Sequence, residues 1–242
     1  MRYIHPVGIS EAFIASGKYI HHQNGQPTGA FEEWSMHELP DGAEMIRVDM
    51  DARAIKGRST LIEAYRNPDG KIDRVDINAF GQADDAVQHV RATYNFYVDH
   101  VEIGRTLDDA ERVYEEMGLP AQTLIYPGSM LFLGMTVAAT AAITAKQSAG
   151  ATIFTYDPQM QPGTALSAET YTQTATDLGV EEITLGSKTY TAHRYERLIP
   201  HYDVLLPNLW VDQYGVLLRH DTPQSSSYVT LSNYARRPDP TK

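Results

Sequence analysis

The residues of this chain that could carry chemistry are tyrosine, histidine and arginine side chains that alternate along predicted strands. In the segment "HRYER", His193, Tyr195 and Arg197 have a spacing of two, which places them on one face of an extended strand. An arginine beside a tyrosine could hold a carboxylate or an enolate, and a histidine could move a proton. Tyr94 offers the same chemistry on an earlier strand. We therefore predict that His193, Tyr94, Tyr195 and Arg197 are catalytic residues of a site that needs no cofactor.

A second group of side chains is predicted to contact the substrate. The chain has 15 tyrosines against 6 phenylalanines, and phenol hydroxyl groups inside a curved sheet need polar partners, which a ligand can supply. The same alternation is also typical of the solvated face of a strand, and a tryptophan is often a core anchor. The predicted substrate-binding residues are Trp34, Glu63, Tyr65, Phe96, His100 and Trp210.

Other classes of site find little support in the sequence. The chain has no cysteine, which excludes disulfides, thiolate zinc sites and a cysteine nucleophile. His21 and His22 are adjacent and would point to opposite faces of a strand, and no H-x-H or H-E-x-x-H occurs, so we expect no metal site. The segment "LGSKT" lacks the upstream glycine of a phosphate loop, and no G-x-G-x-x-G is present, so we expect no nucleotide cofactor. A serine nucleophile is also disfavoured, because "PGSML" lacks the second glycine of G-x-S-x-G.

The charge of the chain restricts its partners. The formal net charge is -11, with 31 acidic and 20 basic residues and no basic run. An acidic surface repels phosphate backbones and anionic membranes, so we expect neither nucleic acid nor a membrane as a partner. The N-terminal segment lacks an apolar core of signal-peptide length, which makes the cytoplasm the expected location unless a leader has been removed.

Strands are predicted at both ends of the chain. Asn24-Gly25, Asp41-Gly42 and Asp69-Gly70 are typical of tight hairpin turns, and the segments between them alternate between apolar and polar residues. Hairpin connections imply antiparallel pairing. Three C-terminal segments, "EEITLGSKTYTAHRYERLI", "NLWVDQYGVLLRHDT" and "SSSYVTLSNYARR", give further strands. The predicted N-terminal strands lie near residues 16–23, 30–38, 44–53, 58–66, 71–80 and 90–103.

The middle of the chain is predicted to be helical. Thr106 could begin a helix that ends at Gly118, and a weaker helix is predicted over 167–178. Residues 129–147 are apolar on nearly all sides, so this helix must be enclosed by protein. The uncharged stretch 123–145 is interrupted by Pro127-Gly128, which favours a buried helix over a membrane span.

These elements predict a single domain over 1–242. It would comprise N-terminal strands (1–104), a helical middle (105–180), C-terminal strands (181–236) and a frayed tail (237–242). The fold class is α+β, mainly β: one strongly curved antiparallel sheet of about ten strands, a half-barrel or open barrel, wrapping the apolar helix. A homodimer through a sheet edge is one possible assembly.

Two parts of the chain resemble a bacterial half-barrel family of unknown function that is related in shape to periplasmic lipoprotein carriers, with a lipocalin-like curved sheet. "GKYIHHQNGQPTGAFEEWSM" resembles its opening hairpin, and "ITLGSKTYTAHRYERL", "NLWVDQYGVLLRHD" and "YVTLSNY" resemble its closing strands. The resemblance implies a curved antiparallel sheet that cradles helices and often an apolar ligand. It implies no catalytic residues.

The sequence therefore leaves two functions open. The first is a cofactor-independent enzyme, of lyase, isomerase or decarboxylase type, that acts on a hydrophobic or aromatic small molecule by general acid–base chemistry. The alternative is a half-barrel protein that binds or carries a lipid or another apolar ligand. A structural protein that pairs through a sheet edge is a third possibility.

Overall fold

A computed structural model describes residues 1–81, 89–108, 110–147, 149–161, 163–200, 204–222 and 225–238. Within these residues it contains one long helix, one short helix and fifteen strands. The helices are α1 (Arg53–Lys56) and α2 (Met130–Gln147). The strands are β1 (Ala12–Gln23), β2 (Gln26–Glu38), β3 (Glu44–Asp51), β4 (Arg58–Arg66), β5 (Ile72–Gly81), β6 (His89–Phe96), β7 (His100–Leu107), β8 (Val113–Gly118), β9 (Leu124–Ile125), β10 (Ala151–Tyr156), β11 (Ala168–Leu185), β12 (Lys188–Ile199), β13 (Val204–Val211), β14 (Leu217–Asp221) and β15 (Ser227–Arg236).

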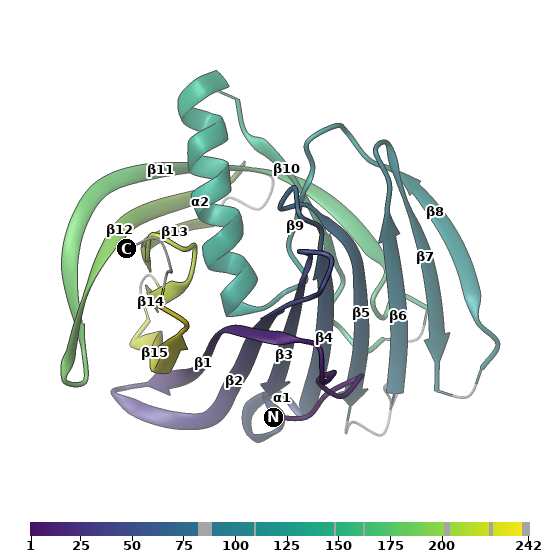
Figure 1. Cartoon of the computed structure of the whole chain (residues 1–242), viewed down its shortest axis with the longest axis horizontal. Coiled ribbons are helices and arrows are strands. Elements are labelled where there is room, and N and C mark those ends of the chain that lie inside the picture. Colours follow the sequence, from purple (N-terminus) through teal and green to yellow (C-terminus); the bar gives the residue numbers. More distant parts are fainter. Residues whose placement is uncertain are drawn as a thin grey trace.

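All the described strands belong to one sheet. Its order is β8-β7-β6-β5-β4-β3-β2-β1-β15-β14-β13-β12-β11-β10-β9, so the first and last strands of the chain pair at its centre. Every pairing is antiparallel except that of β9 with β10. Figure 1 shows how the sheet bends, with the long β11–β12 hairpin on one side and β3 to β8 on the other. The fold is mainly β, as predicted, but it has more strands than expected and the sheet is not closed into a barrel.

The two arms of the bent sheet meet through side chains instead of backbone ladder hydrogen bonds. Phe154 of β10 packs edge-to-face on Tyr94 and Phe96 of β6, with ring centroids 5.4 and 4.9 Å apart. These aromatic contacts hold the end of the C-terminal arm against the inner face of the N-terminal arm. The strands at the two ends of the order, β8 and β9, keep one free side in the described part of the chain. The predicted dimer through a sheet edge stays a prediction.

The helix α2 lies on the inner face of the sheet, as the apolar run predicts (Figure 1). Its approach is close because Gly134 has no side chain: a Cβ there would lie 2.6 Å from both the carbonyl oxygen of Gly215 and the amide nitrogen of Leu217. The first three turns are largely buried, whereas residues 142–147 are exposed or half-buried. By length and composition α2 could cross a membrane, but its first three turns are packed in the core; the predicted enclosure of residues 129–147 therefore holds for these turns and not for residues 142–147.

Three secondary-structure predictions are wrong. The described residues between 106 and 118 form no helix, because β7 continues to Leu107, Asp108 adopts a positive φ of 47°, and β8 begins at Val113. Residues 167–178 belong to β11, whose threonine and tyrosine content favours a strand. The predicted strand 90–103 is two strands, β6 and β7. Of the predicted frayed tail, Arg237 donates its backbone N–H to Ile14 and pairs with Glu38, and residues 239–242 lie outside the described residues.

Candidate functional site

The strands β3 to β8 have one apolar and one polar face. Ile46, Val48 and Met50 of β3 point toward α2, and Arg47 and Asp49 point away from it. We call the face away from α2 the outer face. Because directly paired residues share a face, the register continues this polar row across the sheet. It runs through Arg47, Glu63, Asp76, Thr93 and Gly104, each opposite the next.

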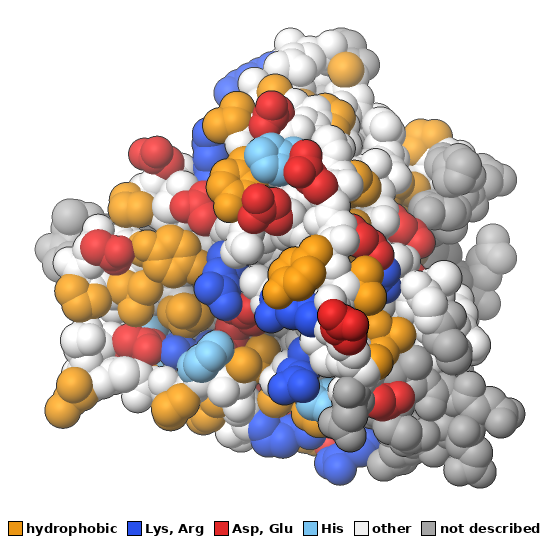
Figure 2. Space-filling view, turned by 90° about the vertical axis from the view of Figure 1, so that its right-hand side faces the viewer, with side chains coloured by type: hydrophobic (Ala, Val, Ile, Leu, Met, Phe, Trp, Pro, Cys, Tyr) orange, Lys and Arg blue, Asp and Glu red, His pale blue; other side chains and the backbone are white. Residues whose placement is uncertain are grey.

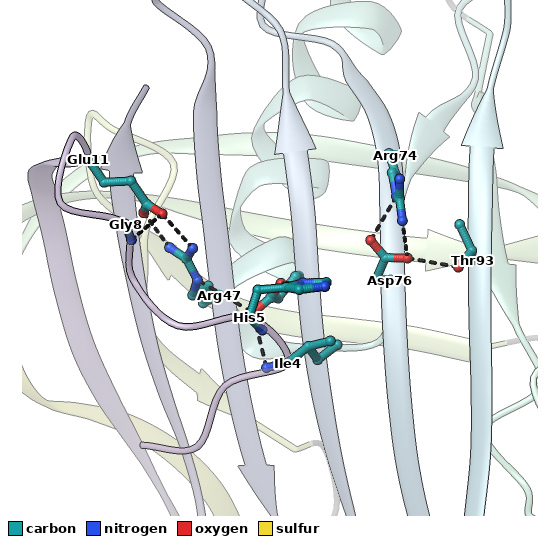
Figure 3. Close-up of polar contacts among 9 residues, drawn as sticks. Ile4, His5, Gly8, Glu11, Arg47, Arg74, Asp76 and Thr93 are labelled. Atoms are coloured by element: carbon teal, nitrogen blue, oxygen red, sulfur yellow. Dashed lines mark hydrogen bonds and ion pairs between the residues drawn. The ribbon is translucent and has the colours of Figure 1, made fainter. Parts of the chain in front are cut away.

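The N-terminal segment, residues 1–11, covers the outer face of β3 and β4. Ile4 and His5 donate their backbone N–H groups to Oε1 of Glu63 at 3.1 and 2.8 Å, and Nδ1 of the His5 ring lies 2.7 Å from Oε2 (Figure 3). Arg2 donates to both carboxylate oxygens of Asp49. Both carboxylates are buried, so these bonds supply the partners that a buried charge requires. The segment is therefore fixed in place by the sheet's own acidic residues.

A buried ion pair fixes the other end of the N-terminal segment. Arg47 donates to both oxygens of Glu11, at 2.6 and 2.8 Å, and its Nε lies 3.4 Å from Glu63 (Figure 3). The hydrogen bonds from Arg47 hold the pKa of Glu11 below its usual range, against the opposing effect of burial. A pair of hydrogen bonds from one guanidinium fixes the orientation of the Glu11 carboxylate as well as its distance from Arg47.

A pocket of about 340 Å³ opens on the outer face, next to Ile4 and His5. Figure 2 shows basic side chains gathered in the middle of the side of the molecule that carries β7 and β8. The pocket combines three arginines, one aspartate and several neutral polar groups over β5, β6 and β7. Its lining residues are Ile4, His5, Arg74, Asp76, Asn78, Arg91, Ala92, Thr93, Gly104, Thr106 and Arg112.

The three arginines of the pocket differ in their partners. Arg74 pairs with Asp76 through Nε at 2.8 Å and Nη2 at 3.0 Å, and the Thr93 hydroxyl donates to the same carboxylate (Figure 3). Arg91 and Arg112 form no ion pair with any residue in the described part of the chain. The pocket therefore has an excess of two positive charges, although the chain as a whole is strongly acidic.

The side chain of Arg112 packs on Gly104 of β7 at the edge of this pocket. Its guanidinium lies against Gly104, where a Cβ would be 2.4 Å from Nη2 and 2.5 Å from Nε, and it lies 5.4 Å from the ring of Tyr114. A larger residue at position 104 would displace it. Arg112 is exposed, and its planar guanidinium is suited to two-point recognition of a carboxylate or phosphate. No three metal-ligand side chains gather anywhere in the part of the chain that the structure describes.

The predicted catalytic residues divide between different environments. His193 is on the surface, with its Nδ1 2.8 Å from Asp177, and stacks on Tyr195 with ring centroids 6.1 Å apart. The register shift beside Tyr195 and Arg197 adds a residue to β13, between Leu206 and Leu209, so the period of two along β12 is kept and both side chains are buried. Arg197 is buried and binds Gln173 instead.

Tyr94 lies in the aromatic core and shares no contact with these three residues. Its hydroxyl donates to the carbonyl oxygen of Leu166 at 2.5 Å, and the ring of Tyr156 stacks on it. Burial raises the pKa of this phenol well above its ordinary value. It is therefore a neutral core donor near neutral pH.

The predicted substrate-binding residues are also dispersed. Trp34 is buried in the core, Phe96 packs on β10, and Trp210 is half-buried with Arg219 5.8 Å from its ring. Glu63 and Tyr65 share the outer face, as expected. His100, expected on the apolar side with Tyr94, follows a turn and lies on the outer face.

His100 pairs there with Asp99 at 2.8 Å. Tyr65 donates its hydroxyl to Asp41. Two of the predicted residues lie next to the pocket: Glu63 is opposite Asp76 and contacts His5, and Tyr65 is opposite Arg74.

The sequence interpretation did not identify Arg74, Arg91 and Arg112. Arg74 and Arg91 alternate with apolar residues in "KIDRVDINAF" and "VRATY", which was a usable signal. Arg112 fell within the wrongly predicted helix, so its position on the sheet could not be inferred.

Comparisons with known proteins bear on the fold. No family model matches the chain, and no curated protein matches it significantly. Among solved structures, it is similar to a β-barrel-like protein of domain of unknown function DUF1849 from Brucella abortus. The TM-score is 0.53 and the identity 8%, over 96% of this chain and 100% of the other. This likeness supports a β-barrel-like architecture shared with a family of unknown function, and it does not confirm the lipocalin-like part of the predicted resemblance.

Proposed function

We propose that this protein binds a small hydrophilic anion in the outer-face pocket, through a carboxylate or phosphate group held by Arg91 and Arg112. The observation that supports this proposal is the presence of two guanidinium groups without acidic partners among the described residues, in a pocket of about 340 Å³. Charge-assisted hydrogen bonds from arginine are among the strongest that proteins make to such anions.

The neutral groups of the pocket complement this charge. Asn78 and Thr106 can donate hydrogen bonds to the ligand, and Thr93 already directs its hydroxyl to Asp76. Because Asp76 is neutralised by Arg74, it opposes an incoming anion less than a free carboxylate would. A polar rather than apolar lining favours a hydrophilic ligand over a lipid.

Binding of inorganic phosphate, succinate and citrate should be measured by isothermal titration calorimetry at low ionic strength. Arg91→Gln and Arg112→Gln should each weaken binding about tenfold, since each removes a charge-assisted contact. Arg53→Gln is the matched control, because Arg53 is exposed and paired with Asp51 away from the pocket. Unchanged affinity in the double variant, or no binding of any of the three anions, would refute the proposal.

A second candidate is the cofactor-independent acid–base enzyme expected from the sequence, with a different proton-transfer group. Glu32 of β2 is buried at the start of α2, and burial raises its pKa to about 7, near the value that suits a general acid or base. Tyr126 and Tyr156 lie close enough for Glu32 to influence their pKa values. If this carboxyl acts, Glu32→Gln should abolish turnover of any substrate found, whereas His193→Ala should not; the opposite result would favour the residues first predicted.

A further inference from the structure

Arg197 lies on the inner face of the sheet, beneath α2. Its Nε donates to Oε1 of Gln173 at 2.6 Å, and the amide of Gln173 donates in turn to the Thr140 hydroxyl of α2 at 2.6 Å. Its Nη2 donates to the Tyr171 hydroxyl at 2.5 Å. The rings of Tyr126 and Tyr171 lie 5.6 and 5.8 Å from the guanidinium carbon. The side chain is thus held in one orientation by polar and aromatic neighbours.

The described residues supply no counter-ion to this guanidinium. Only 4% of Arg197 is exposed, yet no carboxylate in the described part of the chain lies within ion-pair distance of it. Gln173 and Tyr171 are neutral acceptors that use one N–H of Nε and one of Nη2. Nη1 donates to no described residue, and no nitrogen of Arg197 is among the fully buried atoms without a partner, so this edge of the guanidinium is open to water or to a ligand. A buried charge without a partner is strongly unfavourable, so an anion at this edge would relieve the cost.

His220 supplies an independent sign of a missing partner. It is 8% exposed, and its Nε2 is buried without a hydrogen bond in the described structure. Burial lowers the pKa of His220 to about 4; Asp221 raises it, and Arg197 and His21 lower it further. At neutral pH this imidazole is uncharged and can donate to a bound oxygen. His220 is opposite Leu209 on β13, and Leu209 is opposite Tyr195, two residues before Arg197, so His220 and Arg197 belong to the same face of the sheet.

We propose that Arg197 is a second, internal anion site, which binds the carboxylate of an apolar acid such as a fatty acid or an arylalkanoic acid. The remainder of the ligand must be apolar, because the surroundings of Arg197 are phenol rings, the helix α2 and Leu206, its direct partner on β13. A hydrophilic anion would lose its hydration in such a place without replacement. This site goes beyond the proposed function, since the outer-face pocket lies on the opposite side of the sheet.

The test uses dodecanoate below its micellar concentration and 4-phenylbutyrate, with dodecanol as the uncharged control. Calorimetry should show binding of one or both acids to the wild-type protein and at least about tenfold weaker binding of dodecanol. Arg197→Met should remain folded, with a Tm equal to or above that of the wild type, because it removes an uncompensated buried charge. Its affinity for the acids should fall at least about tenfold.

Two further variants make the result decisive. Arg197→Lys keeps the charge but loses the planar fork, so it should also bind the acids more weakly; it serves as the test if the methionine variant does not fold. The double variant Arg91→Gln, Arg112→Gln should bind dodecanoate normally, which separates this site from the outer-face pocket. Failure of the wild type to bind either acid, or equal affinity in a folded Arg197 variant, would overturn the inference.

Discussion

Glu32 should make the stability of this protein depend on pH in a way that one substitution removes. Its Oε2 accepts the backbone N–H of Met130 at 2.8 Å, and its Oε1 accepts that of Leu131 at 3.1 Å, at the positive end of α2. Burial nevertheless raises the pKa of this carboxyl to about 7, against the lowering effect of these bonds and of Ser129.

The direction and size of the change in unfolding free energy with pH follow from the difference between the folded and unfolded pKa values of Glu32. In the unfolded chain Glu32 ionises near its ordinary pKa of 4.5, whereas in the folded protein it keeps its proton until about pH 7. The stabilising contribution is therefore fully present below about pH 4.5 and is lost as pH rises through 7. The gap between the two pKa values corresponds to about 3 kcal/mol of the free energy of unfolding. Glu32→Gln cannot ionise, so it should lack this loss, but it gives up one acceptor for the helix N–H groups, which costs about 1 kcal/mol.

Urea unfolding of wild type and Glu32→Gln near pH 5 and near pH 8 measures the effect. The wild type should be the more stable protein near pH 5, and the variant should be at least as stable near pH 8. The contrary trend caused by His220, whose lowered pKa destabilises the fold as pH falls below about 6.5, is common to both proteins and cancels in the difference. Glu38→Gln, at the exposed end of the same strand, is the control. A stability difference between wild type and Glu32→Gln that is the same at both pH values would refute the reasoning.

Four other substitutions test separate contacts. Gly134→Ala should lower the free energy of unfolding by about 1–3 kcal/mol, because its Cβ meets the backbone before β14; a smaller change would mean that α2 can shift. Tyr94→Phe removes a buried hydrogen bond and should cost about 1 kcal/mol in urea unfolding, and no change would show that the bond contributes little. Glu63→Gln should speed amide hydrogen exchange in residues 1–11, which stays slow if Arg47 alone holds that segment. Gly104→Ala should weaken phosphate binding by displacing Arg112, and undiminished affinity would place the anion elsewhere.

The sequence predicts strands well where the two faces of a strand differ. In β3, Ile46, Val48 and Met50 meet the core while Arg47 and Asp49 do not, so the period of two is visible. The apolar helix is equally clear, because few other structures can bury so many small apolar residues in sequence. Hairpin turns such as Asn24-Gly25 follow from the positive φ of both residues, 51° and 76°.

The failed predictions concern strands without a buried face. In β8 almost every residue is exposed, so its sequence carries no alternation, and the spacing of Leu107, Ala110, Tyr114 and Met117 resembled a helix by coincidence. Much of β11 is exposed as well, because the end of the β11–β12 hairpin extends away from the core. Local sequence cannot identify strands that are specified by pairing with a neighbour.

The candidate pocket could not be predicted, because it depends on register. Arg74, Arg91 and Arg112 come from three separate strands or loops, and each one looks like an ordinary residue of a solvated face. They meet only because Asp76 is opposite Thr93 and Thr93 is opposite Gly104. The partners of Arg197 could not be predicted either, because Gln173 and Tyr171 come from β11, although the prediction that this arginine could hold a carboxylate agrees with the site inferred for it.

The arrangement of charge on this protein makes its unpaired arginines informative. Acidic side chains outnumber basic ones by 31 to 20, so partners for arginine are not scarce. In the described part of the chain, nine arginines form ion pairs, and several of these pairs are buried or bidentate. Five arginines have no ion pair there: Arg58 donates to the carbonyl of Pro158 and Arg236 lies over the ring of Tyr214, which leaves Arg91 and Arg112 on one face of the sheet and Arg197 on the other. An arginine that stays unpaired among so many carboxylates keeps N–H groups that a ligand can accept from. The pocket of Arg91 and Arg112 is open to solvent and suits a hydrophilic anion, whereas the buried surroundings of Arg197 suit an apolar acid.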